Sequence, residues 1–246
     1  MRNCCGNGFW RSFGASVIGP GHVRAGLPNQ DCFAAVQGSR YSVAVVSDGV
    51  GSCRHADVGS SAVCAAVMAT AASFCVQAHG WWQVSKFLDE VKARYLSAVA
   101  DLGVRNCAAT CMFALVYDEE VILAMLGDGL AALERFDGRR TFWTDDKSGA
   151  FSNVVSPLSE RTLATNWKIQ HFPASLCRAV LLCTDGVSDD LRSTDKFIEW
   201  YVESCAPMSD IEASSDTRDM LINWKTPCHT DDKTIVCMMQ GGDRNA

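Results

Sequence analysis

The sequence lacks any Cys-x-x-Cys pair and any excess of positive charge, and each absence argues against a class of protein. Its 246 residues include 22 Lys and Arg against 28 Asp and Glu, which gives a formal net charge of −6. That sign argues against non-specific nucleic-acid binding and against docking on an anionic membrane. The 13 cysteines are an odd number, and several lie in apolar runs, where a free thiol behaves as a small hydrophobe. We therefore expect reduced thiols and no disulfide scaffold.

Long apolar runs are also missing. Residues 1–11 contain no apolar segment of the kind found in a secretory signal. The best candidate for a membrane span, residues 59–78, is rich in Ala and Ser and never reaches 18 clean apolar residues, so we predict a buried helix there. We expect a cytoplasmic, soluble protein with a single domain over residues 13–240, preceded by an N-terminal segment of residues 1–12.

Hydrophobic periodicity predicts grouped strands with helices between and after them. Strands are expected at residues 13–18, 32–36, 41–47, 110–117, 121–126, 130–136, 168–172, 179–183 and 234–239. Helices are expected at residues 57–78 and 81–102, which form a hairpin, and at residues 197–205 and 210–224. Residues 138–157 are polar and aperiodic, which indicates a surface excursion. Because strands and helices do not alternate, this order favours antiparallel sheets with helices packed outside them.

Five aspartates stand at the ends of predicted strands: Asp31, Asp48, Asp128, Asp185 and Asp231. Three of them are followed by glycine, which we expect to let the backbone turn sharply. A single Asp-Gly pair is usually a plain turn, but repeated pairs that each follow an apolar strand are harder to dismiss. Clustered carboxylates need a counter-charge, and few bases lie near them, so we expect divalent cations. Oxygen ligands without His or Cys favour Mg²⁺ or Mn²⁺ over zinc.

Two basic residues, His22 and Arg24, precede Asp31 in a segment that contains glycine and proline. A lone arginine in such a loop is usually solvated. Because this loop leads into a predicted carboxylate site, an anion-binding role is also credible.

The order of these motifs resembles that of the metal-dependent protein Ser/Thr phosphatases of the protein phosphatase 2C family, in particular its bacterial branch. The motifs are GHVR (21–24) with NQD (29–31), SDGVG (47–51), AT (109–110), GDG (127–129), TDGV (184–187) and DDKT (231–234). Each is weak alone, but together they keep the family's order over nearly the whole chain. The resemblance implies an α+β fold, a four-layer α-β-β-α sandwich of two antiparallel β-sheets flanked by helices.

The resemblance also implies a role for each aspartate at the metal site. Asp48 corresponds to the carboxylate that bridges two metal ions, with the Gly49 carbonyl on one of them. Asp185 and Asp231 correspond to ligands of the first ion. Asp31 belongs to the motif that serves the second ion, directly or through water.

A third, weaker ion is implied at Asp128 together with Asp185. Arg24 corresponds to the arginine that holds the phosphate. The residues implied to be catalytic are therefore Arg24, Asp48, Asp185 and Asp231, and the cofactors are two Mn²⁺ or Mg²⁺ ions with an optional third.

The chain departs from the family pattern at three places. The segment between Arg24 and Asp31 is longer than in the commonest form of the motif, which leaves His22 as an alternative group for holding the phosphate. Val50 stands where some relatives carry a histidine proposed as general acid, so no general acid is assigned. Asp232 stands where many relatives have asparagine.

The activity that the resemblance implies is hydrolysis of phosphoserine or phosphothreonine in proteins by a water that bridges two metal ions. The partners would be phosphoprotein substrates of an opposing Ser/Thr kinase, and the protein would be a monomer. The alternative is a pseudophosphatase scaffold that binds phosphoproteins without turnover. A cysteine-nucleophile phosphatase would need Cys-x5-Arg, which occurs once, from Cys5 to Arg11; chance alone supplies about one such match in a chain of this composition.

Overall fold

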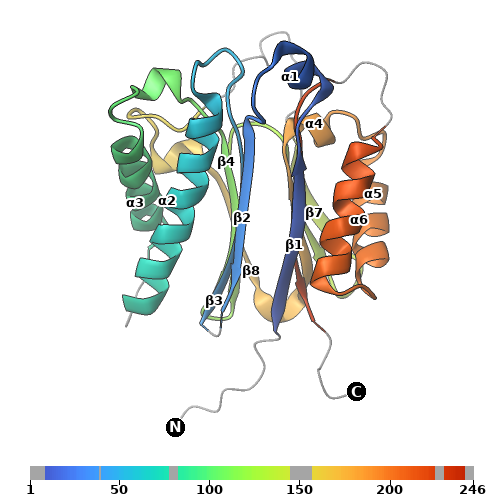
Figure 1. Ribbon diagram of the computed structural model, residues 1–246. Coiled ribbons are helices and arrows are strands. Elements are labelled where there is room, and N and C mark those ends of the chain that lie inside the picture. Colours follow the sequence, from blue (N-terminus) through green and yellow to red (C-terminus); the bar gives the residue numbers. More distant parts are fainter. Residues whose placement is uncertain (1–8, 39, 78–82, 145–156, 225–229, 242–246) are drawn as a thin grey trace.

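The computed structural model of the chain describes residues 9–38, 40–77, 83–144, 157–224 and 230–241. Two antiparallel five-stranded sheets lie face to face, and helices cover both outer faces (Figure 1). Sheet A has the order β1 (Trp10–Val17), β10 (Lys233–Gln240), β9 (Cys177–Cys183), β6 (Leu130–Arg135) and β7 (Arg140–Thr144). Sheet B has the order β2 (Asp31–Gln37), β3 (Tyr41–Asp48), β4 (Cys111–Tyr117), β5 (Glu120–Leu126) and β8 (Lys168–Pro173). The α+β sandwich expected from the sequence is confirmed.

The helices lie outside the sheets in two pairs. Helices α2 (Ala56–Gln77) and α3 (Val84–Ala98) cover sheet B, and α5 (Thr194–Cys205) and α6 (Asp210–Ile222) cover sheet A (Figure 1). Two short helices, α1 (Pro20–Ala25) and α4 (Asp185–Ser188), lie at one end of the sandwich (Figure 1). Three short 3₁₀ segments complete the described elements: Val104–Asn106, Ala164–Asn166 and Ala174–Leu176.

Most strand sequences are continuous runs of apolar residues, because both faces of each sheet are buried. In β4, Phe113 packs toward α3, where its ring contacts Phe87, while the neighbouring Met112 packs between the two sheets. Successive side chains of a strand point to opposite faces, so the alternation between the two apolar layers follows directly. The same layering explains why hydrophobic periodicity located nearly every strand of the sheets.

Helix α2 was predicted as a buried helix rather than a membrane span. By length and composition, Ala56–Cys75 is apolar enough to cross a membrane, and half of that window is buried within the protein. Its fully buried residues Val63, Val67 and Ala71 pack against sheet B and α3. The Thr70 hydroxyl donates to the Ala66 carbonyl at 2.7 Å, which satisfies that buried polar group inside the helix.

Two predictions of irregular structure are wrong. Residues 140–144, placed in the polar excursion 138–157, form the edge strand β7; residues 145–156 lie outside the described part of the chain. Arg140 gives this strand its polar character, because it pairs with the buried Glu134 of β6 at 2.7 Å. The glycine- and proline-bearing loop before Asp31 contains α1, which begins at Pro20 and ends at Ala25, followed by Gly26 in the left-handed conformation (φ 65°).

Strand β1 begins at Trp10, three residues before the predicted start of the strand. Of the predicted N-terminal segment 1–12, residues 1–8 lie outside the described part of the chain, and Cys5 lies among them. All ten cysteines in the described part of the chain are free thiols, as expected.

Candidate active site

The five predicted aspartates meet at the end of the sandwich where α1 and α4 lie. They come from both sheets: Asp31 begins β2 and Asp48 ends β3, while Asp185 follows β9. Asp128 lies in the turn between β5 and β6, and Asp231 lies two residues before β10. Carboxylate oxygens of Asp48, Asp128 and Asp185 lie within 4.8 Å of one another. The antiparallel topology therefore brings together residues that are far apart in the sequence.

Asp48 is at the electrostatic centre of this group. Burial raises the pKa of its carboxyl well above the ordinary value, and the negative charges of the other four aspartates raise it further. Several carboxylates in one low-dielectric place are unfavourable unless cations neutralise them. The group therefore has the electrostatic character of a divalent-metal site.

Asp31 is held in a fixed orientation. The hydroxyls of Thr184 and Thr234 each donate to its Oδ2 at 2.7 Å. Burial raises the pKa of Asp31 to about 7 even though these two hydrogen bonds lower it. Both threonines belong to the sequence motifs around Asp185 and Asp231, but no sequence pattern links them to Asp31.

Asp48 is positioned by Thr110, which precedes β4. The backbone N–H of Asp48 donates to Thr110 Oγ1 at 2.9 Å, and the N–H of Thr110 donates to the Asp48 carbonyl at 2.8 Å. The next residue, Gly49, forms an isolated bridge with Ala109 whose hydrogen bonds are made by the flanking residues. The Gly49 carbonyl takes no part in that pair, which is compatible with the ligand role implied for it.

The glycines after the aspartates serve two different purposes. Gly129, after Asp128, has φ 112°, a conformation that suits glycine, so the expected sharp turn is confirmed there. Gly49 and Gly186 have no positive φ, so the left-handed conformation is not the reason for glycine at these two positions. They are needed for space, because a Cβ on Gly49 would overlap the Ala56 carbonyl and one on Gly186 would overlap the Asp232 carbonyl.

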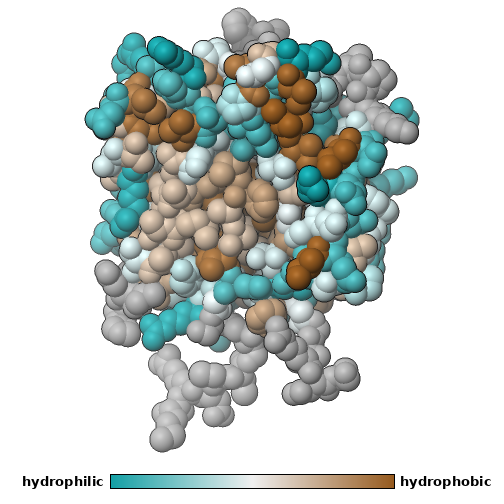
Figure 2. Space-filling view, in the orientation of Figure 1, coloured by the Kyte–Doolittle hydropathy of each residue, from teal (hydrophilic) through white to brown (hydrophobic). Residues whose placement is uncertain are grey.

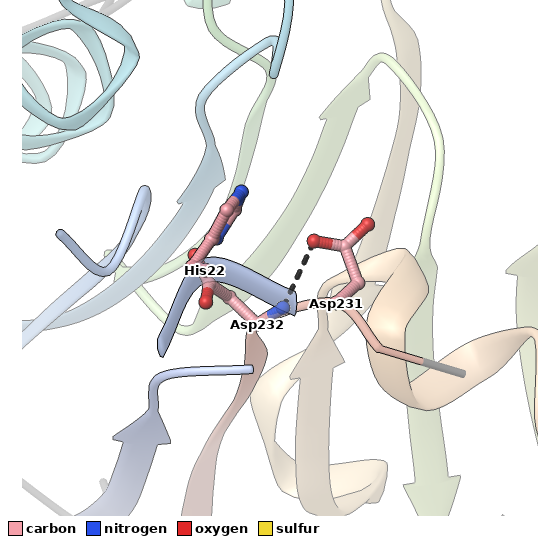
Figure 3. A group of neighbouring side chains, drawn as sticks. All are labelled: His22, Asp231 and Asp232. Carbon is pink, nitrogen blue, oxygen red and sulfur yellow. Dashed lines mark hydrogen bonds and ion pairs between the residues drawn. The ribbon is translucent and has the colours of Figure 1, made fainter. Parts of the chain in front are cut away.

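Asp232 has a structural role that sequence reasoning missed. It is 2% exposed, and its carboxylate accepts the backbone N–H groups of Gly19 and Gln30 at 2.6 Å each. His22 Nδ1 lies 2.8 Å from the same carboxylate (Figure 3). One carboxylate thus ties both ends of the segment that carries α1 to the start of β10. Since these contacts span about 200 residues of sequence, no local pattern could reveal them.

Asp231 and His22 project past the strand ends beside Asp232 (Figure 3). Asp231 accepts the backbone N–H of Asp232 at 2.9 Å through Oδ1, and it is exposed. His22, Asp231 and Asp232 have ligand atoms within 4.8 Å of one another. Three N–H donors already occupy the Asp232 carboxylate. Of the two aspartates, Asp231 is therefore the one available to bind a metal ion together with the aspartate cluster.

Arg24 lies at the rim of the site on α1, with its side chain exposed. It lines the same pocket as Asp231 and Lys233. Within the described part of the chain, Arg24 makes no hydrogen bond or ion pair, so its guanidinium is available to an anion. The five aspartates thus come together as predicted, with Gly49 beside them and Arg24 at the edge.

Comparisons with known proteins agree with this fold and identify the family. The family model described as protein phosphatase 2C matches residues 18–222. The serine/threonine phosphatase Stp1 from Staphylococcus aureus is 14% identical, with a TM-score of 0.70 over 98% of this chain and 99% of that one. The catalytic domain of the phosphatase PstP, solved with two manganese ions, is 20% identical, with a TM-score of 0.65 over 95% and 99% of the two chains.

RsbX, solved in complex with magnesium, is 14% identical, with a TM-score of 0.63 over 95% of this chain and 96% of that one. A search of curated protein sequences found no significant match. At these identities the solved structures support the fold, while the family model covers most of the chain, including four of the five clustered aspartates. The chain therefore belongs to the protein phosphatase 2C family of protein serine/threonine phosphatases.

Proposed function

We propose that this chain hydrolyses phosphoserine and phosphothreonine in proteins, using water activated by two Mn²⁺ or Mg²⁺ ions. The observation that carries the proposal is the convergence of four aspartates on Asp48. Burial and the charges of these four aspartates raise the pKa of Asp48. The donor set is made of oxygen atoms, which suits Mn²⁺ and Mg²⁺. The manganese of PstP and the magnesium of RsbX support the same choice.

Each aspartate has a proposed place around the ions. Asp48 would bridge the two ions, with the Gly49 carbonyl on one of them. Asp185 and Asp231 would hold the first ion, and Asp31 would serve the second. Support comes from the direct pairing of Asp31 with Asp48 across β2 and β3.

Asp128 would hold a third, weaker ion together with Asp185. Their carboxylate oxygens lie within 4.8 Å of each other and of Asp48, which supports this assignment.

When bound, the two ions supply a hydroxide at neutral pH and neutralise charge on the phosphoryl oxygens. The task of the aspartates is to fix the positions of the ions, and rigid strand ends hold them more precisely than loops would. The hydrogen bonds from Thr184 and Thr234 keep Asp31 in one orientation for this purpose.

Arg24 and His22 are the groups proposed to hold the phosphate. Arg24 offers a guanidinium with no partner in the described part of the chain, and a guanidinium can donate two hydrogen bonds to one phosphate. His22 is fixed through Nδ1 by Asp232, so its other ring nitrogen is free to contact the substrate. Replacing Arg24 and His22 one at a time, and comparing the effects on KM and on kcat, tests which of the two residues holds the phosphate.

The proposal extends to a monomeric, cytoplasmic enzyme that opposes a Ser/Thr kinase. The free thiols among the described cysteines support the cytoplasmic location, and the net negative charge favours a soluble monomer. The opposing kinase follows from the proposed phosphoserine and phosphothreonine substrates.

Release of phosphate from a phosphothreonine peptide tests the proposed activity. We expect hydrolysis with Mn²⁺, none in EDTA, and recovery when Mn²⁺ is restored. Asp48→Asn should show no hydrolysis under any of these conditions. Hydrolysis that survives exhaustive chelation would contradict the metal mechanism, and peptide binding without hydrolysis would favour a pseudophosphatase scaffold.

A further inference from the structure

A pocket of about 410 Å³ opens beside the aspartate cluster, where the β1–α1 segment faces the end of α6. Its walls are mostly apolar. Val23 and Arg24 of α1, Ile222 and Trp224 at the end of α6, and Asp231 before β10 are among the lining residues. Figure 2 shows hydrophobic side chains gathered on this part of the surface, between α1 and the nearby end of α6.

Large apolar side chains meet solvent at this pocket. Val23 of α1 is 59% exposed, and Ile222 at the end of α6 is 52% exposed. Exposed apolar groups gathered around a hollow indicate a binding surface more often than apolar residues scattered singly. The two residues lie on different elements, so an apolar group placed between them would contact both walls.

One wall of the pocket is held rigidly before any ligand arrives. Trp224 Nε1 donates to Asp190 Oδ2 at 2.9 Å, which fixes the indole. Its ring also packs edge-on against Phe197 of α5, with 6.1 Å between ring centroids. A preformed wall lowers the entropic cost of binding.

The pocket is continuous with the proposed catalytic site. Asp231 and Arg24 line the pocket, and both belong to that site. An extended chain advances about 3.3 Å per residue, so side chains one to three residues from a phosphorylated residue fall within roughly 10 Å of it. A second copy of this chain seated here would cover Arg24 and Asp231 and block the site, which disfavours that occupant.

We propose that this pocket binds an apolar side chain of the phosphoprotein substrate, located within about three residues of the phosphorylated Ser or Thr. The proposal rests on the function proposed above. It makes Val23 and Ile222 specificity-determining residues, which select substrates with a residue such as leucine near the phosphorylated position.

Two pairs of phosphothreonine peptides test the proposal. Within a pair the peptides are identical except that one carries leucine and the other alanine within three residues of the phosphothreonine. The changed residue precedes the phosphothreonine in one pair and follows it in the other. With Mn²⁺, the wild-type chain should hydrolyse the leucine peptide with a kcat/KM about tenfold higher for one of the two sides, because partial burial of leucine strengthens binding by about that factor.

Variants of both walls should remove this preference. In Ile222→Gln and in Val23→Gln, the ratio of kcat/KM between the leucine and alanine peptides should fall below about threefold. Using the ratio within each variant cancels any change in turnover itself. The matched control is Ile211→Gln: Ile211 is also on α6 and is 84% exposed, but it does not line the pocket, so the ratio should stay near tenfold. Thermal unfolding of each variant confirms folding.

Each alternative outcome has its own signature. Equal kcat/KM for the two peptides in the wild type, or a preference that survives both wall variants, would overturn the pocket assignment while the phosphatase activity stands. No hydrolysis of either peptide would instead overturn the proposed function, and the pocket's role in substrate binding with it. A dimer in sedimentation velocity that Ile222→Gln separates would identify a second copy as the occupant and also overturn the assignment.

Discussion

Asp31 and Asp48 are directly paired across β2 and β3, the first residue of one strand against the last residue of the other. Cross-strand partners carry their side chains on the same face of a sheet, with Cβ atoms about 5 Å apart. The pKa of each carboxyl is raised, mainly by burial and also by neighbouring acids. Both carboxyls can be ionised without a large electrostatic cost only when cations lie between or beside them.

Removing the charge of Asp48 should change stability in opposite directions with and without metal. In EDTA, Asp48→Asn relieves repulsion among the aspartates, so Tm should rise by about 2–4 °C for each kcal/mol relieved. In excess Mn²⁺ the variant lacks a ligand, so its Tm should fall below that of the wild type, because ions that bind only the folded chain stabilise it.

Thermal unfolding followed by circular dichroism in both conditions checks this crossing. Asp118→Asn is the control, because Asp118 lies in the β4–β5 turn at the far end of the strands, so any shift of its Tm should be the same in EDTA and in Mn²⁺. A Tm change of the same sign for Asp48→Asn in EDTA and in Mn²⁺ would contradict repulsion among the aspartates.

The metal-free protein should lose stability as the pH rises from about 4 to about 7. The pKa of Asp31 is about 7 in the folded chain, against an ordinary value of 3.8. Between these values the folded state keeps the proton and the unfolded state has lost it, so unfolding becomes easier as pH rises, by about 1.4 kcal/mol per pH unit for one proton. Urea unfolding in EDTA at several pH values measures the slope, which Asp31→Asn should reduce. An unchanged slope in that variant would rule out Asp31 as its source.

Asp128→Ala should separate the third ion from the first two. Because Asp128 is implied only at the third site, the variant should still bind two Mn²⁺ ions while its kcat falls at least about tenfold. Asp185→Ala, which touches both the first and the third sites, should lose an ion from the pair as well. Equal metal stoichiometry in the two variants would contradict this division of roles.

Asp232→Asn should destabilise the segment that carries α1. The buried carboxylate accepts three N–H groups, but an asparagine amide has only one acceptor oxygen, so buried donors face each other. We expect a loss of about 1–3 kcal/mol in the free energy of unfolding. His22→Ala removes only one donor and should cost less. Urea unfolding compares the two variants, and a smaller loss for Asp232→Asn than for His22→Ala would contradict the role of Asp232 in holding the α1 segment.

Residues with a local signal were predictable from the sequence. The run Val43–Val46 is fully buried between α2 and sheet A, so its apolar character alone indicated a strand. The aspartates at the strand ends could be identified from the sequence because each one stands where an apolar run begins or ends. Motif order then assigned roles that neither composition nor periodicity could supply.

The features that the sequence did not reveal depend on distant partners. Strand β7 lacks apolar alternation because Arg140 pairs with Glu134 on β6 and with Asp195 and Glu199 on α5. Helix α1 has only six residues, too few for a periodic pattern, and Asp232 holds it from the other end of the chain. Such contacts are defined only once the sandwich has formed.

Isothermal titration calorimetry with Mn²⁺ tests the two-ion site most directly. For the wild-type chain we predict at least two Mn²⁺ ions per molecule. Asp48→Asn, which lacks the bridging charge, should lose tight binding at both positions, while the control Asp118→Asn should bind as the wild type does. A wild-type chain that binds one ion or none, or an Asp48→Asn variant that still binds two ions tightly, would contradict the proposed metal centre.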